Sequence, residues 1–218
     1  MMAPSLGLFF FYAAATRTNA MITTSTTLKA LRAAVLLLTA LACNACSPAG
    51  PTLVTYQKKQ VSFVHFSDWK VTNDAIIEEV TQSRTIDLEG PNDALVSVVL
   101  LPSSTDQKLD DFAASIAQDR GSAIKEALSI GSLSAAKVSP SSSQATSADI
   151  GGQQLSGIQQ RYSIKLLGQD VAHEAAFFLV RGKQMTAIIT TQVATEHAKQ
   201  TAPAFSATLR SFRLGNVD

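Results

Sequence analysis

The segment Ile158–Val193, with the sequence IQQRYSIKLLGQDVAHEAAFFLVRGKQMTAIITTQV, contains the strongest β-strand signal in the chain. At its start Ile158, Tyr162, Ile164 and Leu166 alternate with polar residues, so that apolar side chains recur at every second position except Gln160. A period of two predicts a strand with one buried face and one solvated face.

Short turns divide the rest of this segment into two more strands. Gly168 and Gly182 each lie in a short polar stretch, and the residues that follow them are strongly apolar. We therefore expect strands over Val171–Arg181 and Met185–Val193. Loops this short join antiparallel neighbours, because a parallel crossover needs a dozen or more residues. The segment predicts a three-stranded antiparallel meander.

Apolar and β-branched residues predict further strands upstream. Ala94–Leu101 is apolar on both alternating faces, which is typical of a central strand covered on both sides, and Pro102 ends it. Before this strand we expect shorter β segments over Val61–Phe66, Trp69–Val71, Ala75–Val80 and Thr85–Leu88.

An amphipathic helix is predicted after the central strand. The pattern Ser104-x-x-Gln107 has the spacing of a capping box, in which two side chains satisfy free backbone N–H groups. We expect Gly121 to end or kink this helix. Its apolar stripe consists of Leu109, Phe112, Ala113 and Ile116.

A second helix is predicted near the C-terminus. Phe205, Leu209 and Phe212 recur at helical spacing and should pack onto the sheet. Because Pro203 lacks the backbone N–H that a helix interior needs, we expect the helix to start near Ala202, or to kink at the proline.

Composition places the chain among globular proteins. Of the 218 residues, 46% are hydrophobic and 16% charged, and the formal net charge is +1. This balance excludes a charge-driven disordered chain, and it provides no electrostatic basis for binding nucleic acid. The two cysteines are too few for a disulfide framework. The mean hydropathy of +0.14 is high because residues 1–42 are apolar and contain no Asp or Glu.

Residues 1–42 are expected to be a signal or leader, with the functional start at Met21 as one alternative and a long leader as the other. Lys29 and Arg32 precede the apolar run Ala33–Ala42, the order found in secretory signals. We expect residues 43–59 to form a tether and residues 60–215 to form a single domain. Within that domain, the Ser-rich residues 129–148 are expected to be a flexible or edge-like connection.

The residues Thr39–Cys43 resemble a bacterial lipobox, the site where a lipoprotein is cleaved and lipidated. The resemblance implies a lipid on Cys43 and attachment to the membrane in the periplasm, and Asn44 favours the outer membrane. An ordinary cleaved signal followed by an incidental cysteine is the alternative. Cys43 and Cys46 also have C-x-x-C spacing, but a lipidated Cys43 sulfur cannot form a disulfide or bind a metal.

The chain also resembles the PsbP/DcrB-like superfamily, through Ser67-Asp-Trp-Lys-Val71 and through Leu209-Arg-Ser-Phe-Arg-Leu214 on the closing helix. The resemblance implies an α+β fold, namely an α/β/α sandwich with a twisted and mainly antiparallel sheet. It also implies a non-catalytic assembly or accessory module with a protein partner. No catalytic residues or cofactor follow from it.

No catalytic motif is present in the sequence. Ser156 lacks the first glycine of a G-x-S-x-G elbow, and no metalloprotease, P-loop or dinucleotide-binding pattern occurs. We expect no enzyme activity, no cofactor and no metal. The alternatives are a hydrolase that uses Ser156 or His173, and a carrier of small lipophilic ligands. The other two histidines, His65 and His197, stand apart in the sequence.

Overall fold

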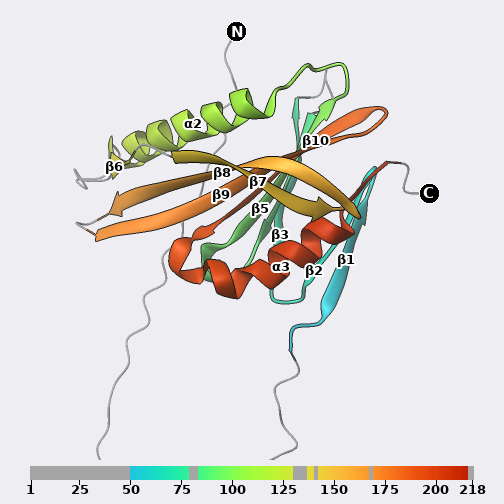
Figure 1. The fold of residues 1–218 in the computed structure, drawn as a ribbon, viewed down its shortest axis with the longest axis horizontal. Helices are drawn as coiled ribbons and strands as arrows, with labels where there is room; N and C mark the ends of the chain where they lie inside the picture. Colours follow the sequence, from blue (N-terminus) through green and yellow to red (C-terminus); the bar gives the residue numbers. More distant parts are fainter. Residues whose placement is uncertain (1–49, 79–82, 130–136, 140–141, 167–168, 216–218) are drawn as a thin grey trace, which may run out of the picture. The chain divides into compact units, whose positions relative to one another are not determined.

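The computed structural model describes residues 50–215, apart from 79–82, 130–136, 140–141 and 167–168. An eight-stranded antiparallel sheet forms most of this part of the chain (Figure 1). Its strands follow in the order β3 (Lys70–Glu78), β4 (Ser83–Glu89), β5 (Leu95–Pro102), β10 (Met185–Ala194), β9 (Gln169–Arg181), β8 (Gln153–Leu166) and β6 (Lys137–Val138), and β7 (Ser142–Ile150) also pairs with β8.

A second, smaller sheet is made of three strands in the order β1 (Leu53–Lys58), β2 (Val61–Phe66) and β11 (Arg213–Leu214). Two helices complete the fold, α2 (Leu109–Ser129) and α3 (Ala198–Ser211). Two short 3₁₀ turns, at Pro91–Asp93 and Thr195–His197, precede β5 and α3.

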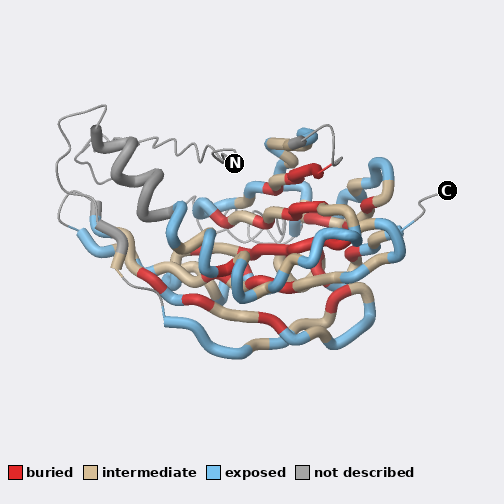
Figure 2. The backbone as a smooth tube through the Cα atoms, turned by 90° about the horizontal axis from the view of Figure 1, so that it is seen from above, coloured by how far each residue is buried: buried red, intermediate tan, exposed pale blue. Residues whose placement is uncertain are grey.

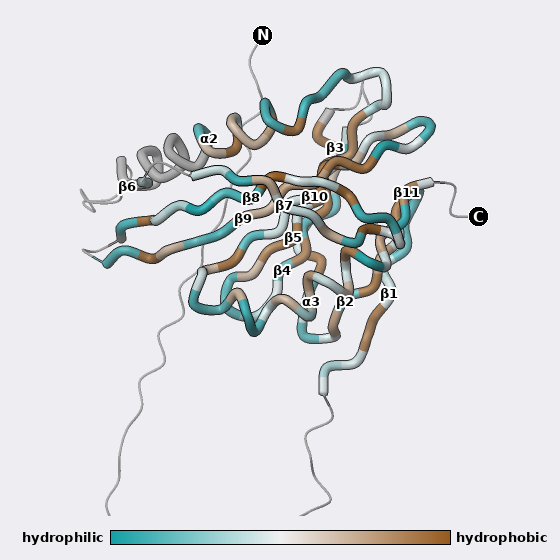
Figure 3. The backbone as a smooth tube through the Cα atoms, viewed as in Figure 1, coloured by the Kyte–Doolittle hydropathy of each residue, from teal (hydrophilic) through white to brown (hydrophobic). Residues whose placement is uncertain are grey.

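The two faces of the large sheet bury different hydrophobic clusters. Phe178 on β9 belongs to the main cluster, which α3 enters with Leu209 and Phe212. The next residue along the strand, Phe177, points the other way, and its ring contacts Phe112 of α2 with 6.3 Å between centroids. Figures 2 and 3 show buried and apolar segments along the central strands. The expected α+β fold, a sheet with a helix on each face, is confirmed.

The meander is confirmed, because β8, β9 and β10 are consecutive antiparallel neighbours. The central strand is confirmed as well. β5 pairs with β4 on one edge and with β10 on the other, and Val96, Val98 and Leu100 are buried in the main cluster.

The predicted start of the domain is wrong. We expected a tether over 43–59, but Leu53–Lys58 forms β1, which pairs with β2. Five of the six β1 side chains are exposed, so the strand lacks the apolar alternation that would reveal it. Backbone pairing to β2 fixes it instead. The first strand of the described residues therefore begins at Leu53, inside the expected tether.

The region between β2 and β4 forms one strand where we expected two. β3 runs from Lys70 to Glu78, and its register against β4 shifts twice, between Val71 and Asn73 and between Ile76 and Glu78. These bulges interrupt the alternation of apolar side chains, which is why the sequence suggested two separate segments.

Within the Ser-rich connection over 129–148, expected to be flexible or edge-like, the residues that the structure describes include β6 and most of β7. β7 makes nine consecutive pairs with β8 through a tight turn at Gly151 and Gly152. Both glycines have positive φ, as a two-residue hairpin requires. The polar residues of β7 are compatible with an edge strand, and the edge-like interpretation is confirmed for this part.

Both helices differ from their predicted bounds. α2 begins at Leu109, Gln107 bonds the carbonyl of Lys108 instead of closing a capping box, and the helix continues through Gly121 to Ser129. α3 begins at Ala198, four residues earlier than expected, and holds Pro203 in its interior. In both cases packing against the sheet outweighs the local helix-breaking tendency.

Candidate interaction surface at strand β1

Strand β1 offers an open edge at the margin of the domain (Figure 1). It makes six uninterrupted pairs with β2, from Leu53 opposite Phe66 to Lys58 opposite Val61. Among the described residues, no strand pairs with its other edge. Leu53 is 59% exposed and Val54 41% exposed, so this edge also presents apolar side chains on both faces of the strand.

The other long edges of the fold carry features that hinder pairing with another chain. β3 contains two bulges, which twist an edge strand away from a potential partner. β7 has the sequence SSQATSADI, which carries no large apolar side chain before Ile150. β1, with the sequence LVTYQK, has no bulge, proline, glycine or acidic residue. It is the edge best suited to accept a further strand.

A polar cluster fastens β1 to the large sheet. The Tyr56 hydroxyl donates to Asp74 Oδ2 at 2.9 Å, and Lys58 Nζ lies 2.5 Å from the same oxygen. Arg84 Nε donates to Asp74 Oδ1 at 2.6 Å. Tyr56 and Lys58 come from β1, whereas Asp74 and Arg84 come from β3 and β4. We call these four residues the β1 latch.

The β1 latch is closed by two further bonds of Arg84. Its Nη2 donates to the Tyr56 hydroxyl at 2.6 Å, and its Nη1 donates to the Lys58 carbonyl at 3.3 Å. The Arg84 side chain is only 5% exposed, against 55% for Lys58. Through a carboxylate, a hydroxyl and a carbonyl acceptor, all three nitrogens of this buried guanidinium contribute to holding the two sheets together.

The latch alters the acidity of two of its members. Hydrogen bonds from Arg84 first, and also from Lys58 and Tyr56, hold the pKa of Asp74 well below its usual range. Burial, together with the hydrogen bond to Asp74, raises the pKa of Tyr56 to about 12. Asp74 is therefore ionised and Tyr56 neutral at neutral pH. This cluster is a structural ion pair, with no proton to exchange in that range.

The small sheet is free of acidic residues. Its three strands contain Lys58 and Arg213 but no Asp or Glu, and Lys59 follows β1 directly. The first acidic residue of the whole chain is Asp68. The open edge therefore lies in a mildly basic region of an otherwise mixed surface.

The structure separates the residues of the hydrolase alternative. Ser156 on β8 lies opposite Ser147, whereas His173 on β9 lies opposite Tyr162 of β8. Six residues along a strand correspond to roughly 20 Å, so Ser156 and His173 are not brought together. The His173 ring stacks on Tyr162, with 5.5 Å between centroids, and its Nδ1 bonds the carbonyl of Val171.

The other two histidines lie elsewhere in the fold. His65 is buried on β2, where its Nδ1 bonds the carbonyl of Phe66. His197 lies in the 3₁₀ turn before α3, and its Nε2 is 3.5 Å from Oε1 of Glu196. Cys43, the predicted lipidation site, and Asn44 lie outside the described residues.

Aromatic side chains of β2 and of the turn that follows it are part of the core. Phe63 is buried and stacks on Tyr56, with 4.7 Å between ring centroids. Trp69 is buried against Gly90, and its ring packs edge-to-face with the ring of Phe205, with 5.6 Å between the two centroids.

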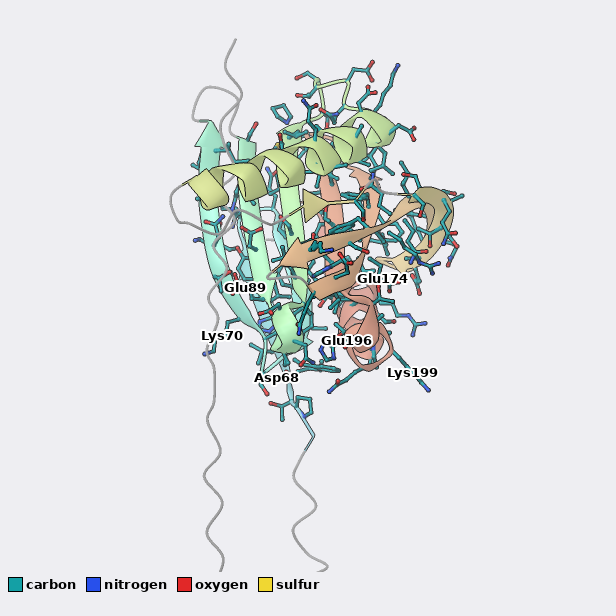
Figure 4. All side chains as sticks on the ribbon, turned by 90° about the vertical axis from the view of Figure 1, so that its left-hand side faces the viewer. Asp68, Lys70, Glu89, Glu174, Glu196 and Lys199 are labelled. Atoms are coloured by element: carbon teal, nitrogen blue, oxygen red, sulfur yellow. The ribbon has the colours of Figure 1, made fainter. Side chains whose placement is uncertain are left out.

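Acidic side chains do not converge on a metal site in the part of the chain that the structure describes. Asp110, Asp111 and Asp119 of α2 are exposed, which fits the expected solvated helix face. Figure 4 shows further charged side chains spread around one end of the large sheet, on separate elements: Asp68, Lys70, Glu89, Glu174, Glu196 and Lys199.

Within the described ranges, no helix is long and apolar enough to cross a membrane. The expected leader over 1–42 precedes these ranges.

Comparison with known proteins reveals only distant likenesses. No family model matches the chain, and no curated protein matches it. Among solved structures, it is similar to the cyanobacterial PsbP (CyanoP) from Synechocystis, with 15% identity, a TM-score of 0.44, and coverage of 79% of this chain and 99% of that one.

Two further solved structures share 12% identity with the chain. LpqN of Mycobacterium tuberculosis, described as involved in cell envelope biogenesis, has a TM-score of 0.37, with 79% of this chain and 88% of that one covered. A protein from Bacteroides thetaiotaomicron has a TM-score of 0.40, with 77% of this chain and 49% of that one covered.

Proposed function

We propose that the protein is a bacterial envelope lipoprotein, anchored by a lipid on Cys43, that acts as a non-catalytic binding or accessory module. The observation that carries the proposal is the position of β1. Only nine residues separate the cysteine of the lipobox-like sequence from Leu53, where the strand with the open edge begins. A lipid anchor would therefore hold this edge close to the membrane surface.

An open strand edge is suited to binding another polypeptide by adding a strand. Backbone N–H and C=O groups along the edge supply affinity, and alternate side chains supply specificity. Leu53 and Val54 add apolar area at the start of β1. Periplasmic placement, with the outer membrane favoured by Asn44, belongs to the same proposal. Neither a cofactor nor nucleic acid is part of it.

Membrane attachment is tested with the full chain expressed in a Gram-negative host. We expect the wild type in the membrane fraction and the Cys43→Ala variant outside it, with processing that is sensitive to globomycin in the wild type but not in Cys43→Ala. The matched control is Cys46→Ala, which leaves the lipobox-like sequence intact and should stay with the membrane. A Cys43→Ala chain that remains membrane-bound would overturn the anchor.

Binding at β1 is tested by photocrosslinking in intact cells. A photoreactive amino acid at Leu53 should capture one defined protein, whereas the same residue at Lys199, an exposed position on α3, should not. Equal capture at both positions, or repeated capture of nothing at Leu53, would contradict a binding role for this edge.

A further inference from the structure

We propose that the strand added to β1 is β1 of a second copy of this chain, paired antiparallel about a two-fold axis at Thr55. This inference rests on the proposed function, because it names the partner of the same edge. The two small sheets would then join into one six-stranded sheet in the order β11–β2–β1–β1–β2–β11. Such an interface is closed and uses the same surface of both copies.

Strand geometry restricts the registers that a two-fold axis permits. Residues directly opposite one another in an antiparallel pair point to the same face. The axis must therefore lie midway between one residue and its own copy, because any register that sets a residue opposite its sequence neighbour would put side chains of opposite faces together. With the axis at Thr55, Thr55 lies opposite its own copy, Val54 opposite Tyr56, and Leu53 opposite Gln57.

This register matches the side chains of β1. It produces a Thr–Thr pair and two pairs of a β-branched residue with an aromatic one, both of which stabilise neighbouring strands. It also places the exposed Leu53 and Val54 in cross-strand pairs. On the face that points toward the large sheet, Val54 and Tyr56 of the two copies would form one continuous apolar row.

Charge favours the antiparallel arrangement over a parallel one. Lys58 ends β1 and Lys59 follows it, so a parallel pair would place four lysines side by side. In the antiparallel pair the lysines of the two copies lie at opposite ends, beyond the residues that are paired. No acidic residue of β1 is available to compensate a parallel arrangement.

The tether is long enough for both copies to share one membrane. The nine residues 44–52 reach at most roughly 30 Å when extended. In the antiparallel pair the two Leu53 residues are four strand positions apart, or roughly 14 Å. Two chains on the same surface also meet at a raised effective concentration, which favours an interface as small as one strand pair.

Cysteine crosslinking in membranes tests the register directly. The full chain carries Cys46→Ser, and single cysteines are introduced at three exposed positions of one face, Leu53, Thr55 and Gln57. Opposed residues are about 4.5–5.5 Å apart between Cα atoms, within the range of a disulfide. Cells are treated with a mild oxidant, and the products are separated without reducing agent.

We expect Thr55→Cys to yield a product of twice the chain mass. Leu53→Cys and Gln57→Cys should yield almost none alone, but a mixed product when the two variants are co-expressed. The chain with Cys46→Ser and no new cysteine is the control. A Thr55→Cys chain that stays single, or a stronger product at Leu53 or Gln57 alone, overturns the proposal.

The failure of this inference is distinguishable from failure of the proposed function. If Thr55→Cys stays single while the photocrosslinker at Leu53 captures a different protein, a second copy is excluded and the binding role stands. If the Cys43→Ala chain remains in the membrane fraction, the lipid anchor is refuted whatever the crosslinking shows. Circular dichroism of each cysteine variant verifies that the fold is retained.

Discussion

Arg84 of the large sheet donates a 2.6 Å hydrogen bond to the hydroxyl of Tyr56 in the small sheet. The two residues are 28 positions apart in sequence and belong to different sheets. Because Arg84 is buried and also bonds Asp74, this contact connects β1 to the interior of the domain. The buried Arg84 side chain thus adds a tie to the large sheet to the backbone pairing that joins β1 to β2.

Removing the buried cation of the β1 latch should cost far more stability than removing the exposed one. Arg84→Met leaves Asp74 mostly buried with one partner fewer, and we expect a loss of about 3–5 kcal/mol in the free energy of unfolding. Lys58 contacts the same carboxylate from the surface, and Lys58→Met should lower the free energy of unfolding by less than about 1 kcal/mol. Urea denaturation of both variants measures the difference. Equal losses would show that burial of Arg84 is not what matters.

Tyr56 should make the fold sensitive to alkali. Below pH 10 the phenol is neutral in both states, but between pH 10 and about 12 the unfolded chain loses its proton first, so the free energy of unfolding falls as pH rises. In Tyr56→Phe this contribution is absent. We expect the wild type to lose more stability than the variant between pH 9 and 11, measured by urea denaturation at each pH. Parallel curves would refute the raised pKa.

Gly90 is expected to tolerate no side chain. A Cβ at this position would lie 2.3 Å from Cε2 of Trp69, whose ring is fixed in the core. Its φ of −122° is allowed for alanine, so the effect of Gly90→Ala is purely steric. We expect a loss of about 1–3 kcal/mol, read from thermal or urea denaturation. Gly50→Ala is the control, since nothing lies within 4 Å of its Cβ, and its stability should be unchanged.

Replacing Pro203 should stabilise the protein. The residue is exposed in the interior of α3, where a proline leaves the carbonyl four residues earlier without its helical donor. Pro203→Ala restores that bond, and we expect the free energy of unfolding to rise by about 1–3 kcal/mol. Ala202→Pro, at the neighbouring exposed position, should act in the opposite direction. Destabilisation by Pro203→Ala would imply that the proline shapes how α3 packs.

Elements with one or both faces buried were predictable from the sequence, since burial imposes a regular pattern on the side chains. The meander β8–β10 and the central strand β5 belong to this group. β1 and β7 escaped because most of their side chains are exposed, so they carry no regular apolar pattern. Each is aligned by backbone pairing with the strand that follows it, and backbone pairing leaves no mark on the choice of side chains.

The β1 latch could not be predicted for a similar reason. Asp74 and Arg84 lie ten residues apart, and Tyr56 lies a further 18 residues upstream of Asp74, spacings that match no helical or strand motif. Their meeting depends on two sheets that pack together. The candidate site therefore emerged only once β1 itself was placed, whereas the lipidation proposed at Cys43 rests on the sequence alone.

The order of strands in the large sheet has a consequence for how the chain folds. β3, β4 and β5 are joined by short turns, as are β8, β9 and β10, so each trio can assemble from neighbouring residues. The two halves meet only along β5 and β10, from Leu95 opposite Gln192 to Pro102 opposite Met185. Closing this seam joins two parts of the chain that are far apart in sequence, and such pairing forms more slowly than pairing between neighbouring strands, so we expect the seam to form late in folding. Until β10 is in place, the apolar β5 has one edge unpaired.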